Sequence, residues 1–352
     1  MRKMDSTHYA LIRACVAKPD EFEAALRRWE SIQDINDIDY ATMRLIPFLY
    51  KKALLNEITM KSHGICKGLY LRSWYLFKTS GNPTENWINN NLFKEDIILL
   101  KGCALQKTVY SNDPPIRPAD DIDILIRSSS INSIITKMQS ESFSFDKTHS
   151  LGTQINLRKA INFQSGLMNI DVHWNIFHVG LDPEFTERLW HRSAILSNGS
   201  RTLTDTDNLI HTLLHGYENN SIAPIRWIID AFSLVSANTV DWDLFWDEVY
   251  MSAWNRIIHN QLNLLKEFGI LIEPPKNPKK RFSFVLLITE LFLVSESLLI
   301  KRLCRLLGFD FGVWAQNQKM KPTMLNYVLH FSKWFPLVVK SWKEFKRGKK
   351  SI

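Results

Sequence analysis

The chain has few of the residues that cross-link or interrupt a fold. Its four cysteines, Cys15, Cys66, Cys103 and Cys304, lie far apart and form no CxxC spacing. Neither a disulfide framework nor a zinc site is therefore indicated, and a reducing, cytoplasmic environment is expected. Gly and Pro number only 13 each and 45% of residues are hydrophobic, which excludes global disorder. With 352 residues, the chain can form two or three packed units.

Long hydrophobic runs are also lacking. Charged residues such as Asp5 and Arg13 interrupt the first twenty residues, so no secretion signal is expected. The most apolar stretch, residues 282–300, contains Glu290 and Glu296. It falls short of the ~20 apolar residues that a membrane-spanning helix needs. We expect it to form a buried helix.

Positive charge is concentrated at one end. Residues 319–350 hold nine Lys or Arg against one acid, Glu344, so this segment carries the whole net charge of +8. The remainder is neutral overall, and no sequence-specific binding of nucleic acid is predicted. Apolar residues at spacings of three and four predict a basic amphipathic helix, kinked near Pro336. It could bind an anionic membrane or a partner helix, although docking on the protein's own helical region is the preferred interpretation. The apolar stripe comprises Met324, Val328, Phe331, Phe335, Val338, Trp342 and Phe345.

The pattern of apolar residues divides the chain into four regions. Residues 1–90 predict helices, with an interruption at Gly81-Asn82-Pro83. Residues 91–200 alternate between strands and helices, whereas residues 201–272 are again helical. A Pro-rich linker at 273–280 precedes a last helical region, 281–352.

Within the second region, strands are predicted at 97–100 and 121–126, and helices at 104–110 and 131–140. Two further alternating runs, 154–163 and 167–176, flank Gln164-Ser165-Gly166 and predict a hairpin. The sheet should therefore be mixed. The expected fold class is α+β: a small mixed sheet between N-terminal helices and a large C-terminal helical region.

A pair of acids lies in the second predicted strand. Because side chains alternate along a strand, Asp121 and Asp123 share a face with Leu125, while the isoleucines occupy the other. Their Cα atoms should be about 6.5–7 Å apart, close enough to bind one Mg²⁺ together or to bridge two ions. Such like charges repel unless a cation or hydrogen bonds relieve them. Taken alone, the pair is equally compatible with ordinary acids at the end of a loop.

A glycine turn precedes this pair. The strand at 97–100 runs into Lys101, Gly102 and Cys103 at the start of a helix. Glycine lets the backbone approach a ligand, and the first N–H groups of a helix favour phosphate. Lys101 would add a positive charge. The alternative is a tight turn kept for packing alone.

A third acid lies in the second hairpin strand. Asp171 and His173 share one face of this strand, whose other side chains are mostly apolar. A carboxylate in an apolar strand is costly to bury without compensation, which favours a metal-site or proton-transfer role. For His173, a hydrogen-bonded position beside the site is the preferred interpretation.

These segments resemble a known family. LLKGCALQKTVYSNDPPIRPADDIDILI followed by NIDVHWNI is similar to the uncharacterised nucleotidyltransferase family of the DNA polymerase β-like superfamily. His215 in LIHTLLHG, and Arg226 and Asp230 in IRWIIDA, also resemble the helical part of that family. The resemblance covers roughly residues 40–235 and makes these three residues, with His173, candidates for supporting the site from outside the ligand shell.

The resemblance implies a metal-dependent enzyme with two Mg²⁺ or Mn²⁺ ions, which transfers NMP from an NTP such as ATP to a hydroxyl and releases pyrophosphate. Asp121, Asp123 and Asp171 would bind the metal and carry the catalysis. The nucleotide contacts would come from Lys101, Gly102, the backbone of Cys103 and Arg117. Many superfamily members have Ser or Gly where Cys103 stands, so no hydroxyl is available there.

A second class of function stays open. The chain could bind a nucleotide or a partner through the same fold without turnover, and the basic C-terminal helix could attach it to a membrane surface. The acceptor, whether small molecule, peptide or macromolecule, and the preferred NTP have no readable motif.

Overall fold

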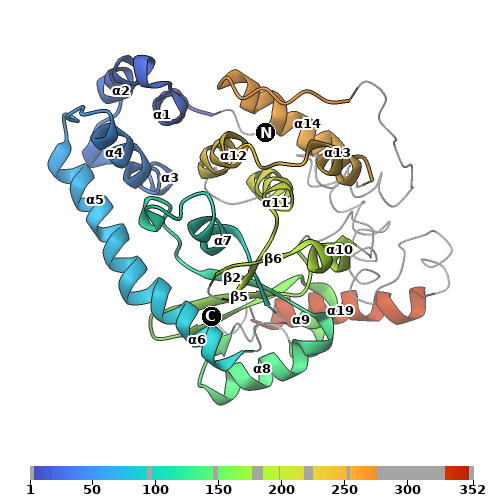
Figure 1. The fold of residues 1–352 in the computed structure, drawn as a ribbon. Coiled ribbons are helices and arrows are strands. Elements are labelled where there is room, and N and C mark those ends of the chain that lie inside the picture. Colours follow the sequence, from blue (N-terminus) through green and yellow to red (C-terminus); the bar gives the residue numbers. More distant parts are fainter. Residues whose placement is uncertain are drawn as a thin grey trace.

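The computed structural model describes residues 4–92, 97–145, 150–176, 185–197, 199–217, 225–251, 254–275 and 330–348. The buried helix expected at 282–300 lies outside the described residues. Figure 1 shows a sheet with helices on both sides. Among the described residues, the structure contains no helix that is both long enough and apolar enough to cross a membrane.

The first layer is helical, as predicted for residues 1–90. Its α-helices are α1 (Ser6–Val16), α2 (Pro19–Ile32), α3 (Tyr40–Met43), α4 (Ile46–Leu55), α5 (His63–Leu76) and α6 (Asn82–Asn91). The predicted break at Gly81-Asn82-Pro83 is wrong: a π-helical segment, Phe77–Gly81, joins α5 directly to α6. Pro83 lies in the first turn of α6, immediately after the π-helical segment.

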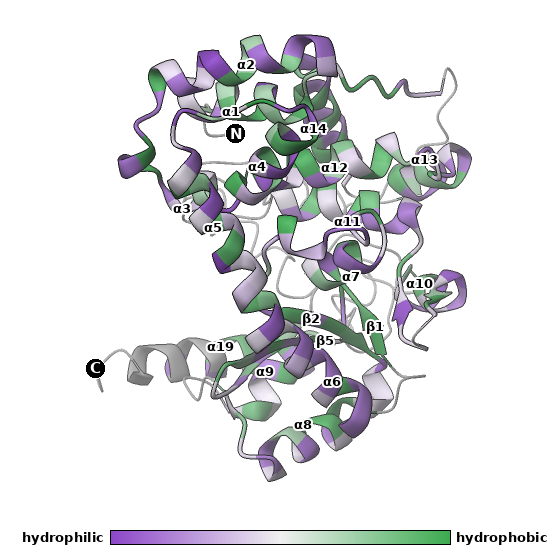
Figure 2. Ribbon diagram, turned by 60° about the vertical axis from the view of Figure 1, so that its left-hand side comes forward, coloured by the Kyte–Doolittle hydropathy of each residue, from purple (hydrophilic) through white to green (hydrophobic). Residues whose placement is uncertain are grey.

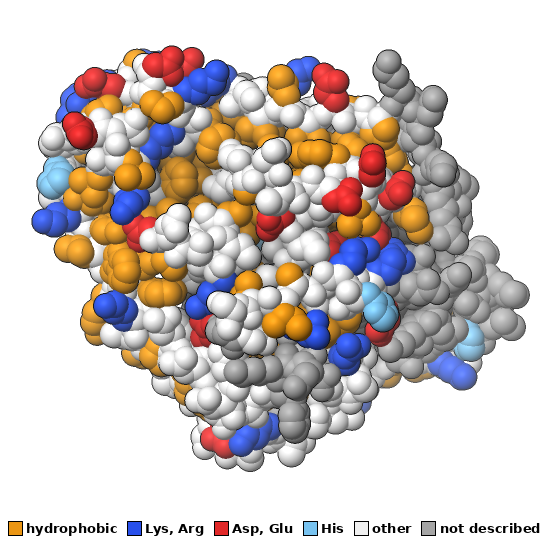
Figure 3. Space-filling view, in the orientation of Figure 1, with side chains coloured by type: hydrophobic (Ala, Val, Ile, Leu, Met, Phe, Trp, Pro, Cys, Tyr) orange, Lys and Arg blue, Asp and Glu red, His pale blue; other side chains and the backbone are white. Residues whose placement is uncertain are grey.

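The N-terminal helices present apolar side chains to solvent. Leu55 at the end of α4 and Tyr75 in α5 are 73% and 65% exposed, and Leu54, Ile65 and Leu71 are exposed as well. Figure 3 shows hydrophobic side chains gathered on this side of the molecule, on the left of the view. Nothing in the described structure covers this surface.

The mixed sheet is confirmed, with seven strands in the order β3-β4-β5-β2-β1-β7-β6. β2 pairs in parallel with β5 and antiparallel with β1, while β1 pairs in parallel with β7. The short strands β3, β6 and β7 were not predicted. The strands are β1 (Ile97–Leu99), β2 (Ile122–Ile126), β3 (Ser144–Phe145), β4 (Ala160–Ser165), β5 (Met168–His173), β6 (Ala194–Ile195) and β7 (Arg201–Thr202).

The predicted hairpin is present as β4 and β5, paired antiparallel from Ser165 and Met168 inward. Gly166 occupies the turn with φ of +58°, a conformation in which glycine avoids a steric cost. The strand expected from residue 154 is wrong at its start, because α9 (Leu151–Leu157) occupies it. The N–H of Gln154 donates to the carbonyl of Ser150 at 3.0 Å, so a local helical bond replaces strand pairing. Alternation over so few residues does not distinguish the two structures.

The two faces of the sheet belong to different hydrophobic cores. Ile122, Ile124 and Ile126 pack with α6 and with α8 (Ile131–Ser140) in one core. Leu125, on the opposite face, joins the larger core formed by the N-terminal and C-terminal helices. Figure 2 shows the strongly hydrophobic character of β1 and β2. The alternation predicted for this strand is confirmed.

The helices that follow the sheet lie against its other face and against the N-terminal layer (Figure 1). They are α10 (Phe185–Arg192), α11 (Asp205–Tyr217), α12 (Arg226–Ser236), α13 (Trp242–Met251) and α14 (Asn255–Glu267). The connection between the sheet and α11 brings this layer directly over the acid-bearing strands.

The basic amphipathic segment forms α19 (Phe331–Gly348), with Pro336 inside the helix. Trp334 is buried, whereas Phe331 and Phe335 are exposed. Among the described elements, α19 packs against α9 beside the sheet. The preferred docking on the protein's own helical region stays a prediction. Attachment to a membrane or to a partner stays a prediction.

Candidate functional site

Two neighbouring strands bring the predicted acids together. β2 and β5 run parallel, and their register places Asp123 directly beside Asp171 and Leu125 beside His173. Since alternate residues share a face, the acids of both strands project from the same side of the sheet. The two carboxylates are 48 residues apart in the chain but adjacent in the fold.

His173 links the two carboxylates. Its Nε2 lies 3.0 Å from Asp123 Oδ1 and 3.0 Å from Asp171 Oδ2. Asp123 and His173 are buried, while Asp171 remains partly accessible. Ligand atoms of these three residues all lie within 4.8 Å of one another, so the group could hold a metal ion. The position of His173 beside the carboxylates agrees with the sequence interpretation.

Lys101 reaches the same carboxylate from the glycine turn. Its Nζ forms an ion pair with Asp123 Oδ1, and the N–H of Leu100 donates to the carbonyl of Asp123 at 2.9 Å. The backbone of Lys101 has φ of +47°, in the left-handed region that side-chain-bearing residues rarely adopt. Such strain persists only where the surroundings impose it. The turn is thus held in register with the acid-bearing strand.

The charges of the cluster act on one another. Burial alone would raise the pKa of Asp123, but Lys101 and His173 hold it well below its ordinary range. Burial likewise opposes ionisation of Asp171, and His173 overcomes it, so that this pKa is lowered too. The pKa values of His173 and Lys101 are raised because the carboxylates outweigh the cost of burial. The cluster therefore contains both ionised carboxylates and cations.

Asp121 differs from the other two acids. Burial, followed by the neighbouring charge of Asp123, raises the pKa of Asp121 to about 6. It lines a pocket together with Asp120 and Asn169, between the start of β2 and the continuous α5–α6 helix near Phe77. Asp121 is thus partly accessible, and Lys101 offsets only part of the effect that burial and Asp123 have on its pKa. Its assignment as a metal ligand stays a prediction.

Helix α11 covers the acidic face. His211 is buried on this helix, and His215 follows one turn later with ring centroids 6.1 Å apart. Burial, then the nearby charges of His215 and Lys101, lower the pKa of His211 well below its ordinary value. The helical region therefore lies near Lys101 and the sheet at His211, whereas the supporting role predicted for His215 stays a prediction. The closer residue, His211, was given no such role from the sequence.

Glycine at position 102 is needed for packing, in addition to the predicted close approach of a ligand to the backbone. A Cβ atom at this position would lie 2.4 Å from Nη1 of Arg117 and 3.0 Å from Cβ of Ala119. Glycine is therefore required for the guanidinium to lie against the turn. Arg117 is in turn fixed by Asp230 on α12, with Nη2–Oδ2 at 2.8 Å and Nε–Oδ1 at 3.3 Å. Tyr110 donates to the same carboxylate at 3.0 Å.

These contacts define what Arg117 and Cys103 can offer. Burial opposes the charge of Arg117, yet Asp230 raises its pKa, so it remains a cation next to the turn. The thiol of Cys103 packs in the core beneath the sheet. The first hydrogen bond of α7 (Lys101–Lys107) joins the N–H of Ala104 to Leu100. The N–H groups of Gly102 and Cys103 thus precede the helical ladder, as a phosphate site requires. Binding of phosphate there stays a prediction.

The donor set fits a divalent cation. Asp123 and Asp171 share one face of the sheet and form a possible metal site with His173, while burial and then the charge of Asp123 raise the pKa of the nearby Asp121. Carboxylate oxygens suit Mg²⁺ and Mn²⁺, whereas imidazole is a softer ligand. His173 is placed to fix the orientation of Asp123 and Asp171 through hydrogen bonds, although it could also bind a softer ion directly.

Sequence reasoning missed the contribution of the N-terminal helices. Arg44 pairs with Asp120 at 3.0 Å, and Tyr40 donates to the same carboxylate. Arg226, predicted as a supporting residue, donates to the carbonyl of Pro118 in the same loop. Arg44 contacts the carbonyl of Pro118, which lies 74 residues later in the chain. Nothing in the sequence around Arg44 indicates this contact. The only available signal was an arginine in an otherwise apolar helical segment.

The fold and the site define a class: a protein with a mixed sheet whose parallel strands bring carboxylates together at a glycine turn. The chain belongs to the uncharacterised nucleotidyltransferase family, whose model matches residues 88–269. The matched part contains the sheet, the acids, the glycine turn and α11–α14 up to residue 269. No curated protein and no solved structure matches the chain. The family and the possible metal site together support nucleotidyl transfer.

Proposed function

We propose that the protein transfers NMP from an NTP to a hydroxyl group of an acceptor and releases pyrophosphate. The single observation that carries this proposal is the parallel pairing that places Asp123 beside Asp171, with Asp121 two residues before Asp123 in the chain. Membership of a nucleotidyltransferase family supports the same reaction. Lys101 and His173 offset the charges of Asp123 and Asp171, and the additional charge of Asp121 would favour a divalent cation.

Asp121, Asp123 and Asp171 would hold two Mg²⁺ or Mn²⁺ ions. When bound, the metal supplies a nucleophile of lowered pKa and neutralises charge on the leaving pyrophosphate. Asp171 is the most suitable base, because it is partly accessible and lies beside the buried pair of Asp123 and His173. His173 keeps both carboxylates in one orientation through its Nε2.

The nucleotide contacts come from the turn. The N–H groups of Gly102 and Cys103 point from the start of α7, and Lys101 and Arg117 supply positive charge on either side. Charge-assisted hydrogen bonds of this kind stabilise a leaving phosphate without proton transfer. The pocket lined by Asp121, Asn169 and Phe77 offers space beside Asp121 for a second reactant.

The test is label transfer. The protein is incubated with each α-labelled NTP, Mg²⁺ or Mn²⁺ and a lysate as acceptor pool, and released pyrophosphate is measured in parallel. Asp121→Asn and Asp171→Asn should abolish transfer. Asp243→Asn, which removes an exposed acid from α13, is the matched control and should transfer label like the wild type.

The opposite result supports the other class of function. If the wild type binds NTP with metal but releases no pyrophosphate with any NTP, the protein is a nucleotide-binding module without turnover. Transfer that persists in Asp121→Asn and Asp171→Asn would contradict the assigned site even if the activity were real.

A further inference from the structure

Three arginines from separate parts of the chain meet at one backbone carbonyl. Arg226 donates to the oxygen of Pro118 at 2.5 Å, and Nη2 of Arg44 lies 3.5 Å from the same oxygen. Arg117, the residue before Pro118, directs its Nη1 to this oxygen at 3.4 Å. Arg44 comes from the N-terminal helices, Arg117 from the loop before β2, and Arg226 from the start of α12. We call these three residues the arginine cluster.

The arginine cluster contains more positive charge than its acids neutralise. Asp230 binds Arg117 through two hydrogen bonds, and Asp120 pairs with Arg44. Arg226 makes no ion pair with any carboxylate in the parts of the chain that the structure describes. One carbonyl oxygen is a weak counterpart for a full positive charge.

The surroundings of Arg226 make this imbalance costly. Burial, followed by the charges of Arg117 and Arg44, lowers the pKa of Arg226 well below its ordinary value. The Nε of Arg44 is also buried, and within the described residues it has no acceptor. A partly buried cation without a counter-charge disfavours the folded state unless it serves another purpose. The same arrangement favours an anion that could accept from both side chains.

The arginine cluster lies next to the glycine turn. Nη1 of Arg117 would contact a Cβ atom at Gly102, and Ala119 approaches the same position at 3.0 Å. Asp120, the partner of Arg44, is followed directly by Asp121. The surplus cations therefore border both the predicted phosphate site and the acids of β2. An anion bound there would lie beside the nucleotide.

We propose that Arg44 and Arg226 bind the polyphosphate tail of the NTP, beside Arg117 at the carbonyl of Pro118. This inference rests on the proposed function, since it assigns a place to the β- and γ-phosphates of that substrate. Guanidinium groups match phosphate oxygens with two parallel donors, which a lysine cannot do. The N-terminal helices, which precede the matched residues 88–269, thereby complete the nucleotide site.

The experiment measures binding rather than turnover. Affinities for ATP, AMP and inorganic tripolyphosphate are determined by calorimetry for the full chain, with and without Mg²⁺. The variants are Arg226→Gln and Arg44→Gln, and Arg28→Gln serves as the control that removes one exposed positive charge from α2. Arg44 is partly accessible, so its variant provides the measurement if Arg226→Gln does not fold.

We expect each cluster variant to lose at least about tenfold in affinity for ATP and tripolyphosphate, the size of one charge-assisted hydrogen bond. Affinity for AMP should change by less than about twofold, because AMP lacks the β- and γ-phosphates, and Arg28→Gln should bind all three like the wild type. Unchanged binding of tripolyphosphate, or an equal loss for AMP, would overturn the inference.

Failure of this inference and failure of the proposed function give different results. Tripolyphosphate binding that depends on Arg44 and Arg226, without pyrophosphate release from any NTP, retains the anion site and overturns the transferase activity. Label transfer by the wild type, with affinities for ATP unaffected in both variants, retains the transferase activity and overturns the anion site.

Discussion

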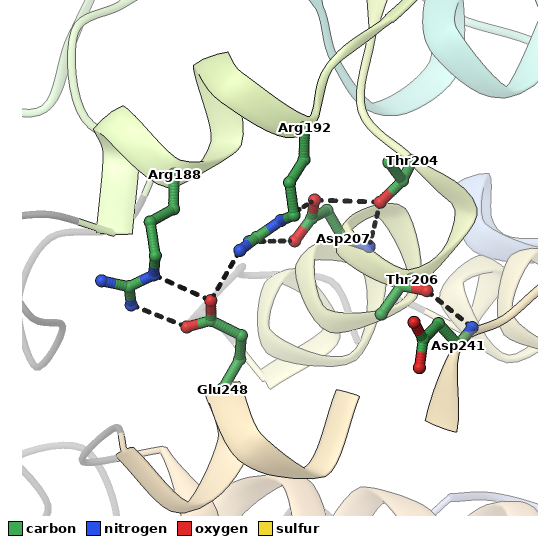
Figure 4. Close-up of polar contacts among 7 residues, drawn as sticks. All are labelled: Arg188, Arg192, Thr204, Thr206, Asp207, Asp241 and Glu248. Atoms are coloured by element: carbon green, nitrogen blue, oxygen red, sulfur yellow. Dashed lines mark hydrogen bonds and ion pairs between the residues drawn. The ribbon is translucent and has the colours of Figure 1, made fainter. Parts of the chain in front are cut away.

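Two clusters of charged side chains lie in the same molecule and differ in balance. In Figure 4, Arg192 binds both oxygens of Asp207, at 3.0 and 2.7 Å, and also reaches Glu248 at 2.7 Å. Arg188 binds both oxygens of Glu248 at 2.9 and 2.8 Å. Two cations thus match two anions between α10, α11 and α13. We call these four residues the balanced cluster.

The acids of the sheet are not balanced in this way. Lys101 and His173 both form ion pairs with Asp123, whereas the pKa of Asp121 is raised to about 6. A cluster whose charges cancel is expected to stabilise the packing of helices. A cluster that keeps a surplus of one sign is expected to serve a ligand of the other sign, here a divalent cation. The difference therefore separates structural from functional charge within one fold.

The largest expected effect concerns the unbalanced acids. Asp121→Asn should reduce nucleotidyl transfer by at least about a hundredfold, as loss of a key electrostatic contact commonly does. Without divalent cations, the same variant should be more stable than the wild type at pH 8, because neutralising Asp121 removes its repulsion with Asp123. Transfer is measured with labelled NTP, and stability by urea unfolding. A variant that loses both activity and stability would show that Asp121 is structural.

The opposite result is expected in the balanced cluster. Asp207→Asn should lower the free energy of unfolding by about 3 kcal/mol, because it leaves Arg192 partly buried with a weaker partner. The folded fraction should retain its transfer activity. Urea unfolding and activity per folded molecule test both statements. A gain in stability on removing Asp207 would end the distinction between the two clusters.

The sequence revealed the parts of the site that depend on local pattern. Alternation in β2 and β5 identified both faces of each strand, and therefore the common orientation of Asp123 and Asp171, whereas Asp121 precedes β2, which begins at Ile122 and not at residue 121 as predicted. The glycines in the turns at residues 102 and 166 could also be identified from the sequence. These features depend on neighbours two to four residues away, so the pattern contains them.

Contacts between distant segments were not predictable in the same way. The approach of Arg44 to Pro118, and of Arg192 to Asp207, depends on how helices pack and leaves no periodic signal. α9 was assigned to a strand because its few residues alternate by chance. The missing side chain at Gly102 makes room for Arg117. This could likewise be recognised only from the fold, since the two residues are fifteen positions apart.

Acid should weaken the balanced cluster. Burial opposes the charge of Glu248, but Arg188 and Arg192 lower its pKa below the ordinary value of 4.5. A lowered folded pKa means that ionised Glu248 stabilises the fold above about pH 4.5, and that this contribution disappears as the pH falls through the folded pKa. Glu248→Gln should therefore cost about 2 kcal/mol at pH 7 and less than that at pH 3.5. Urea midpoints at both pH values measure this, and an equal deficit at both would exclude ionisation as the cause.

The smallest expected effect concerns Thr204, which caps the start of α11 and contacts Asp207 of the balanced cluster. Thr204 donates its hydroxyl to Asp207 Oδ2 at 2.9 Å and accepts from the N–H of Asp207 at 3.2 Å, at the start of α11. Thr204→Ala removes both bonds and should cost about 1 kcal/mol, the usual value for a lost helix cap. Thr204→Ser, which keeps the hydroxyl, is the matched control and should recover most of the loss in urea unfolding. Because Arg192 still binds both oxygens of Asp207, the deficit should stay well below that of Asp207→Asn. Equal deficits would mean that the cap, and not the ion pairs, positions this carboxylate.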